Sequence, residues 1–421
     1  MRRVVKVSRI RIVMTIIVVI FVTLLTGCTG KEPNEIAYVV ALGIDSTDDD
    51  NYKITIQYAN TTQISGGASE SGGKAGSEIV DNVTIEAPNI YAGVGLANNI
   101  VSKSFSMSHA KLIVFSKEIA EKGVKDMIET LVRSEEIRPD VFIAVANTTA
   151  NDYLTAVNPE MEVNPAQYYQ LIYQKNQLVG IPDGQLREFF TGLYTDNYDS
   201  ILPIAGVIEG SGGNSQNDDK GQSKDGQNEG SEGSSESLDS FESKSSNEKD
   251  ENEKEKDAEK NTSKYEYDIK NYVGGETAIE KKNKAEAIGA AVFEKDKMVG
   301  ELGEVETEIC KMLKGDYTYS YLTYYNNDTP DIPITVKTTQ QKKPKYKIDT
   351  DKKTVDIELY IESDLYSLPA DYNVENKIED FERDVANYTS SACTEFINNF
   401  TKKYNSDILK LNEKIKYKFL T

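Results

Sequence analysis

The sequence is poor in histidine and cysteine, which serve in many nucleophilic and metal sites. It has one histidine, His109, and only three cysteines among 421 residues. A Ser-His-Asp or Cys-His arrangement would have to use His109, and neither a Gly-x-Ser-x-Gly nor a His-Glu-x-x-His motif occurs. Because His109 precedes a predicted strand, a structural role in a loop is favoured over a catalytic one. An exported hydrolase is therefore disfavoured, and we expect no enzymatic activity.

The scarcity of cysteine also excludes a disulfide framework. Cys310 and Cys393 have no Cys-x-x-Cys partner, so isolated, partly buried thiols are expected, with a Cys310–Cys393 disulfide as the alternative. A chain of this length can instead be stabilised by burial of an apolar core.

No sequence pattern for a cofactor or a metal ion is complete. Gly93-Val94-Gly95 lacks the third glycine of a dinucleotide-binding loop. The run Asp-Asp-Asp-Asn at 48–51 lacks the alternate spacing of acids and the distal glutamate of a calcium loop. We predict a solvated turn at 48–51, and neither a metal nor a small-molecule cofactor.

The charge is strongly acidic and unevenly distributed. The net charge is −21, yet the first 27 residues hold five basic residues and no acid, so the remainder of the chain carries −26 (−21 − 5). An acidic body repels nucleic acid and anionic lipid headgroups. Neither nucleic-acid binding nor polybasic adhesion to a membrane is expected.

The N-terminal segment has the pattern of a bacterial lipoprotein signal peptide. After the basic stretch, an apolar run of about fourteen residues reaches Leu25, too short for a membrane span of roughly 20 residues. It ends in Leu25-Thr26-Gly27-Cys28, which has the form of a lipobox. We predict cleavage after residue 27 and a diacylglycerol plus an N-acyl lipid on Cys28. The alternative is an anchor helix in which Cys28 is incidental.

The first part of the mature chain, 28–208, alternates predicted strands and helices, which indicates α/β or α+β layering. Strands are predicted over 36–45, 52–58, 84–87, 110–115 and 141–146, and helices over 90–102 and 119–132.

The segment 209–263 changes character. Between residues 209 and 262 it holds 16 acids, 7 bases and only two large apolar residues, Leu238 and Phe241. Such a segment cannot bury enough surface to offset chain entropy, so we predict a disordered acidic linker. A spacer is the favoured interpretation, and an interaction tail is the alternative.

The last part, 264–421, is predicted to form a second domain. A strand over 288–293, a turn, a helix over 304–313 and an alternating strand over 354–361 precede a long amphipathic helix over 378–404, expected to lie across a sheet. The predicted fold class is α/β (α+β), with several domains of mixed β-sheets flanked by helices.

Several segments, in order, resemble the Ger(x)C family, the C-subunit lipoproteins of spore germinant receptors. With the lipobox, they are Leu42-Gly43-Ile44-Asp45, Ser108–Val114, Ala120–Gly123, Leu131–Pro139, Gly289–Phe293, Asp296–Gly300 and Asn405–Ile408. Two features depart from the family: the acidic segment is longer, and the C-terminus lacks a tryptophan-bearing tail.

The resemblance implies a non-enzymatic protein of several α/β domains, anchored by its lipid at the outer face of the spore inner membrane. It implies assembly with the A and B subunits of a receptor that responds to nutrients. The membrane subunits are implied to recognise the nutrient, so no direct small-molecule ligand is expected here.

Arg133, Glu136 and Arg138 are the candidate subunit contacts. Arginine offers a planar fork for carboxylates, and this arginine-rich exit from a helix is unusual in an acidic chain. The alternative is an intradomain ion pair or a helix C-terminal charge. The alternative function for the whole protein is a solute-binding lipoprotein of a transporter, which predicts a cleft between two lobes.

Overall fold

The computed structural model describes residues 13–20, 32, 35–49, 51–59, 80–159, 162, 164–174, 180–195, 198–208, 271–277, 283–326, 329–368 and 377–420. The lipobox, Cys28 and the segment 209–263 lie outside these ranges, so the predictions made for them stay predictions. Residues 13–20 are helical. No helix in the described ranges is both long enough and apolar enough to cross a membrane.

Within the described residues, one large mixed sheet has nine strands in the order β3-β2-β1-β5-β6-β7-β8-β9, with β4 beside the first part of β1. Their bounds are β1 Ile36–Ser46, β2 Tyr52–Ala59, β3 Val80–Ala87, β4 Ser104–Ser106, β5 Leu112–Ser116, β6 Phe142–Ala146, β7 Ile201–Val207, β8 Ala285–Glu294 and β9 Lys297–Leu302.

The centre of this sheet is parallel and its two sides are antiparallel. Strands β1, β5, β6 and β7 run parallel, whereas β2 and β3 on one side and β8 and β9 on the other pair antiparallel. Every residue of β5 and β6 is buried, which explains why both strands are continuous apolar runs in the sequence.

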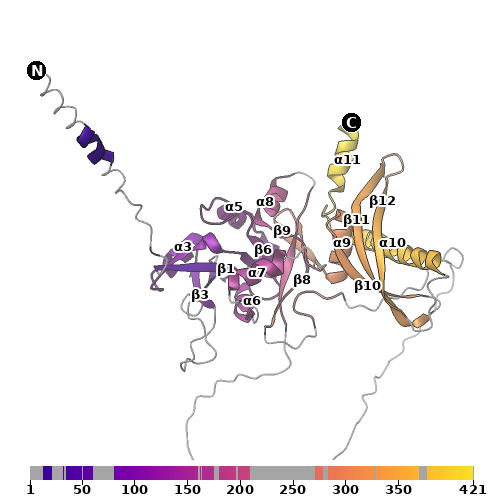
Figure 1. Cartoon of the computed structure of the whole chain (residues 1–421), viewed down its shortest axis with the longest axis horizontal. Helices are drawn as coiled ribbons and strands as arrows, with labels where there is room; N and C mark the ends of the chain where they lie inside the picture. The colour runs from indigo at the N-terminus through magenta and orange to yellow at the C-terminus, as the bar shows by residue number, and fades with distance from the viewer. Residues whose placement is uncertain are drawn as a thin grey trace, which may run out of the picture. The chain divides into compact units, whose positions relative to one another are not determined.

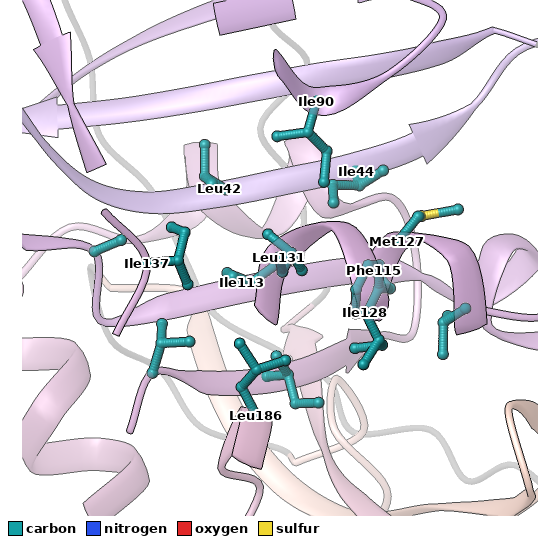
Figure 2. Close-up of a cluster of buried hydrophobic side chains, with 14 of the residues drawn as sticks. Leu42, Ile44, Ile90, Ile113, Phe115, Met127, Ile128, Leu131, Ile137 and Leu186 are labelled. Atoms are coloured by element: carbon teal, nitrogen blue, oxygen red, sulfur yellow. The ribbon is translucent and has the colours of Figure 1, made fainter. Parts of the chain in front are cut away.

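Helices cover both faces of the large sheet (Figure 1). Ile113 and Phe115 of β5 point into one core with α3, α4, α5 and α8, whereas Leu112 and Val114 point into another with α6 and α7. This alternation is the period-two pattern of a strand buried on both faces. Figure 2 shows β1, β5, α3, α5 and α8 contributing to the first core. The helices are α3 Ile90–Ala97, α4 Lys117–Lys122, α5 Lys125–Val132, α6 Ala150–Ala156, α7 Pro165–Gln174 and α8 Leu186–Tyr194.

The helix predicted over 119–132 is two helices, so that prediction is wrong in one respect. Gly123 ends α4 with a φ of +125°, a conformation that L side chains rarely adopt. The backbone N–H of Val124 donates to the carbonyl of Asp296 (3.0 Å) instead of continuing the helix. The helix predicted over 90–102 likewise ends early, at Ala97.

The last two strands of the large sheet come from beyond the acidic segment. β8 pairs antiparallel with β7, with Leu202 opposite Ala291, and β9 pairs with β8. The segment predicted to open a C-terminal domain therefore completes the sheet that begins at residue 36.

A smaller antiparallel sheet of three strands follows: β10 Tyr319–Asn326, β11 Thr329–Asp349 and β12 Thr354–Ser367. As expected, the long helix α10 (Ile378–Lys403) packs on one face of it, where the Tyr324 ring lies 6.3 Å from Phe381 and 6.0 Å from Tyr388. The remaining helices are α9 (Glu304–Lys314) and α11 (Leu411–Leu420). The predicted α/β (α+β) class, with mixed sheets flanked by helices, is confirmed.

Candidate functional site: the joint between the two parts of the chain

The Leu42–Asp45 segment of β1 positions helix α6. The Asp45 carboxylate accepts hydrogen bonds from the backbone N–H groups of Ala150 (2.6 Å) and Asn151 (3.0 Å) at the start of α6. Burial raises the pKa of Asp45, and these two N–H groups oppose that rise. A Cβ at Gly43 would lie 3.0 Å from Leu154, so glycine permits the close approach of α6.

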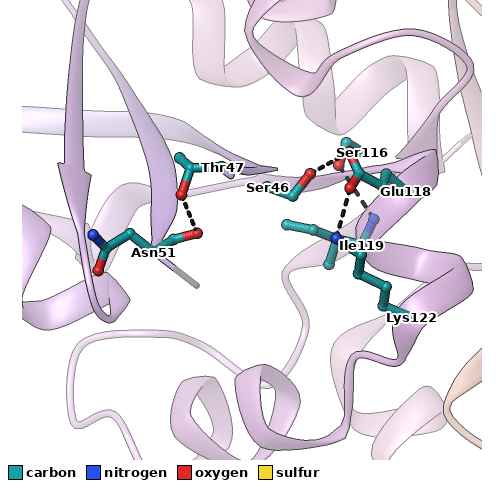
Figure 3. A network of polar contacts seen from close by, with 7 residues as sticks. All are labelled: Ser46, Thr47, Asn51, Ser116, Glu118, Ile119 and Lys122. Atoms are coloured by element: carbon teal, nitrogen blue, oxygen red, sulfur yellow. Dashed lines mark hydrogen bonds and ion pairs between the residues drawn. The ribbon is translucent and has the colours of Figure 1, made fainter. Parts of the chain in front are cut away.

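Helix α4 is fixed to the end of β1 by a polar network (Figure 3). The Ser116 hydroxyl accepts from the N–H of Ile119 (3.4 Å), which caps the helix. Ser46 of β1 donates to Glu118, and Lys122 donates to the same carboxylate (2.6 Å). The bonds from Lys122 and Ser46 lower the pKa of Glu118.

The same helix contacts the β8–β9 hairpin, so it links the two parts of the chain. Lys117 forms an ion pair with Glu301 (2.7 Å), and this hydrogen bond raises the pKa of Lys117. A Cβ at Gly123 would lie 2.6 Å from a carboxylate oxygen of Asp296, so the hairpin turn approaches closely because residue 123 is glycine. We call the contacts between residues before 209 and residues after 270 the joint.

Asp199, just before β7, is at the centre of a second group of joint contacts. It is 8% exposed, and its two carboxylate oxygens accept from the backbone N–H groups of Lys295 (2.9 Å) and Asp407 (2.8 Å). The Ser406 hydroxyl donates to the carbonyl of Phe293 (2.8 Å). Asp199 therefore joins the β8–β9 turn to the chain that leaves α10.

The segment Asn405–Ile408 also starts the last helix. The carboxylate of Asp407 accepts from the N–H groups of Leu411 (2.8 Å) and Asn412 (2.9 Å) at the beginning of α11. Asn405 donates to Glu294 (2.7 Å). These family-like residues thus hold the C-terminal helix against the large sheet.

A cleft of about 850 Å³ lies beside the joint and is lined from both parts of the chain. Lys311 is 5% exposed and donates to the carbonyl of Ile181 (3.1 Å), and burial lowers its pKa. The ammonium groups of Lys314 and Lys410 lie 6.0 and 3.9 Å from the centre of the Tyr198 ring. Carboxylates also line the cleft, so it can take polar groups of either charge; they are Asp183, Glu188, Asp316 and Glu413.

The three candidate subunit contacts all have partners within the chain. Arg133 pairs with Glu129 (2.6 Å) and remains 73% exposed, and Arg138 pairs with Asp140 through two hydrogen bonds (3.0 and 3.2 Å). Glu136 accepts from the N–H of Met107 (2.6 Å). The intradomain pairing expected as the alternative is therefore present, and contact with another subunit stays a prediction.

Of the three candidate subunit contacts, the structure places two in the same groove. Arg133 and Glu136 line a shallow groove of about 730 Å³ with residues of α3 and β4, whereas Arg138 does not line it. The bond from Asp140 raises the pKa of Arg138.

The histidine and the two cysteines that were considered as catalytic or redox candidates in the sequence are packed against other side chains or buried. His109 lies in a short 3-10 turn, Met107–His109, with its ring edge-to-face on Tyr38 at 4.9 Å. Cys310 and Cys393 are free and buried, and burial raises their pKa values to about 11 and about 12. The 48–51 turn is held by Thr47, and no cluster of three or more metal-ligating side chains occurs in the described ranges.

Sequence reasoning missed Asp199 and gave no role to Asp407. No short motif marks Asp199, because its partners are backbone N–H groups of residues about one hundred and two hundred positions away. Asp407 lies in a segment noted only for its resemblance to the family. No capping pattern marks it, because an N-cap residue ordinarily stands directly before its helix, whereas Asp407 lies four residues before Leu411.

Curated relatives share the spore-germination description. The chain is 27% identical over 173 residues to spore germination protein KC of Bacillus subtilis (strain 168), which covers 38% of this chain and 42% of that protein. It is 28% identical over 145 residues to putative spore germination protein YfkR of the same organism, covering 34% and 37%. The matched stretch thus spans less than half the length of these relatives.

A solved structure, the crystal structure of the GerBC protein, matches with a TM-score of 0.45 at 15% identity over 90% of this chain and 87% of that one. Two family models match in order: the spore germination protein N-terminal domain at residues 30–207, and the spore germination B3/GerAC-like C-terminal domain at residues 288–421. Together they cover most of the chain, which therefore belongs to the Ger(x)C family of spore germination proteins.

Proposed function

We propose that this chain is the lipid-anchored C subunit of a spore germinant receptor. It would act at the outer face of the spore inner membrane by assembling with the A and B membrane subunits, and it would be required for nutrient-triggered germination. The observation that carries the proposal is the ordered pair of family domains over residues 30–207 and 288–421.

The anchor follows from the sequence around Cys28. Two acyl chains give stable attachment, since each buried CH₂ contributes about 0.8 kcal/mol and a single chain binds only marginally. The net negative charge of the body gives it no electrostatic attraction to an anionic surface. A covalent lipid therefore accounts best for residence at the membrane.

The joint supports a role in transmitting subunit contacts rather than in catalysis. Asp199, Lys117 and Val124 connect elements that are distant in sequence through bonds of 2.7–3.0 Å. A displacement imposed on the C-terminal helices would reach the large sheet through the bond between Asp407 and Asp199. The proposal includes neither a catalytic residue nor a direct small-molecule ligand.

A solute-binding lipoprotein is the second candidate, favoured by the cleft of about 850 Å³ lined from both parts of the chain. Such a protein closes around its ligand by hinge motion. Here β7 and β8 are paired across the line between the two parts, which disfavours a hinge there. A thermal-shift screen with nutrients separates the candidates, because one large shift would favour the solute-binding function.

Deletion of this gene in its spore-forming host, with wild-type and Cys28→Ala alleles restored in parallel, tests the proposed function. Germination is followed by the loss of optical density. We expect the deletion to abolish the response to one nutrient class while direct chemical triggers still act, and Cys28→Ala to restore it poorly. Normal germination on every nutrient, in a strain that lacks the sister receptors, would contradict the proposal.

A further inference from the structure

Helix α3 is apolar around its whole circumference, although one side of it faces solvent. Its sequence is Ile-Tyr-Ala-Gly-Val-Gly-Leu-Ala. Ile90 and Val94 are buried against the sheet, whereas Tyr91 is 40% and Leu96 is 48% exposed. A surface helix ordinarily carries charged or polar residues on its outer side, as α5 does.

The apolar surface continues beyond the end of this helix. Ile100 is 69% exposed, the highest value of any large apolar side chain in the described ranges. Its N–H donates to the carbonyl of Ala97 (3.0 Å), so the chain is still turning and Ile100 follows Leu96 by four residues. We call Tyr91, Leu96 and Ile100 the α3 patch.

The stretch of chain that holds the α3 patch differs in charge from the rest of the sequence. Residues 87–117 contain no aspartate or glutamate, although the chain has 69 such residues among 421. The same stretch carries Lys103, Lys111 and Lys117. In the fold, Arg133, Glu135 and Glu136 line the groove that Tyr91 borders, so the low acidity belongs to residues 87–117 themselves and repulsion from anionic headgroups is reduced only along that stretch.

The α3 patch also lies near the place where the chain would leave for its anchor. β4 follows Ile100 by four residues, a span of at most about 14 Å, and Ser104 pairs with Ile36, the first residue of β1. The Asn98 side chain accepts from the N–H of Phe105 (2.8 Å) and fixes this connection. Only eight residues, at most about 29 Å, separate Ile36 from Cys28.

We propose that the α3 patch inserts into the headgroup–acyl boundary of the bilayer that holds the lipid on Cys28. The inference rests on the proposed anchoring. It adds a second, non-covalent contact, so that the chain is held at two points and its orientation on the membrane is fixed. The partner is a lipid surface, because exposed aromatic and aliphatic side chains near lysines suit the headgroup–acyl boundary, and the anchor on Cys28 keeps this surface within reach of the bilayer.

The test uses the full-length acylated protein in phosphatidylcholine–phosphatidylglycerol vesicles without any other subunit. Ile100→Cys carries an environment-sensitive fluorophore, and some vesicles contain a nitroxide on carbon 5 of an acyl chain. Ile378→Cys, at a position 51% exposed on α10, is the matched control. Unsubstituted protein measures labelling of the buried native thiols.

We expect the nitroxide to quench the probe at position 100 by about half and to leave the probe at position 378 nearly unchanged. Leu96→Glu should abolish the quenching, and Leu171→Glu, at another exposed leucine, should not. Equal quenching at positions 100 and 378 would overturn the inference. So would shielding of position 100 that appears only after A and B subunits are added.

Flotation of the vesicles separates this inference from the proposed function. Protein that floats through its acylated Cys28 but shows no quenching at position 100 leaves the anchor intact and overturns the α3 contact alone. Acylated protein that does not float would overturn the anchor and, with it, the α3 contact.

Discussion

The large sheet and the small sheet bury their strands very differently. All residues of β5 and β6 are buried in the large sheet, whereas none of the fourteen residues of β12 is buried in the small one. A groove of about 1210 Å³ runs between β12 and α10 and is lined by apolar side chains such as Ile357 and Leu359. The first sheet is closed on both faces, and the second is incompletely packed against its helix.

This difference indicates where stability and adaptability lie. Fully buried side chains contribute most to the free energy of unfolding, and sparsely buried regions open more easily. The joint lies at the large sheet, and Asp199 links that sheet to the chain that leaves α10, the helix packed on the small sheet. The small sheet can therefore change its packing without unfolding the large one.

A pair of truncations tests the contrast most strongly. Phe115 of β5 is fully buried, so Phe115→Ala should lower the free energy of unfolding by about 3–5 kcal/mol. Leu359 of β12 is only half-buried, and Leu359→Ala should lower it by about 1 kcal/mol. Urea unfolding followed by circular dichroism measures both. Equal losses would show that the small sheet is packed as tightly as the large one.

The next largest loss of stability is expected when the joint is disrupted at Asp199. Asp199→Ala leaves the N–H groups of Lys295 and Asp407 without their acceptor, which should cost about 2–3 kcal/mol. Asp199→Asn keeps one carbonyl oxygen, so it should cost about half as much. Hydrogen exchange should show faster exchange at Asp407 and α11 in the alanine variant. Unchanged exchange at Asp407 and α11 would show that Asp199 does not stabilise this part of the joint.

A pair of glycine substitutions has smaller effects of opposite sign. Gly123→Ala forces a side chain into a φ of +125° against Asp296 and should cost about 1–2 kcal/mol. Gly95→Ala lies in α3 with no atom within 4 Å of the new Cβ, so it should stabilise by about 0.5–1 kcal/mol. Thermal unfolding measures both effects. A Gly123→Ala variant that is more stable than the wild type would show that α4 does not require glycine at its C-terminal end.

A pH dependence of stability is expected where α9 meets the small sheet. Burial raises the pKa of Glu308 from 4.5 to about 7, while a hydrogen bond from Ser320 (2.8 Å) opposes the rise. The folded protein therefore binds a proton that the unfolded chain releases above its ordinary pKa. Stability should fall as pH rises from about 4.5 to about 7 and then level off.

Glu308→Gln tests this dependence, because the amide oxygen still accepts from Ser320 and has no charge to bury. The variant should match the wild type near pH 4.5 and exceed it at pH 8. If the free energy of unfolding changed with pH in the same way for both proteins between pH 4.5 and pH 8, the pH dependence would not come from Glu308.

Elements with strong apolar periodicity could be predicted from the sequence. The strands β1, β2, β5, β6 and β8 and the long helix α10 were found within a few residues, because their buried positions repeat with the period of the element. β7 was missed because Pro203 interrupts its apolar run, and proline argues against a central strand. β11 was missed because lysine, threonine and glutamine occupy most of its positions.

The joint could not be predicted in the same way. Sequence periodicity does not say which sheet β8 joins, since its pairing with β7 spans the acidic segment. Asp199 bonds only to backbone groups, which leave no residue pattern. The end of α4 carried a signal in Gly123, but the helical period continued on both sides of it.

Co-isolation from spore inner membranes tests the proposed receptor role most directly. Full-length protein with a C-terminal affinity tag would be solubilised in mild detergent, purified and analysed by mass spectrometry, with the Cys28→Ala protein as the control. The account predicts that A and B receptor subunits copurify with the wild-type chain in a fixed ratio and that Cys28→Ala greatly reduces their yield. Recovery of the acylated chain without either subunit, from membranes that contain both, would contradict it.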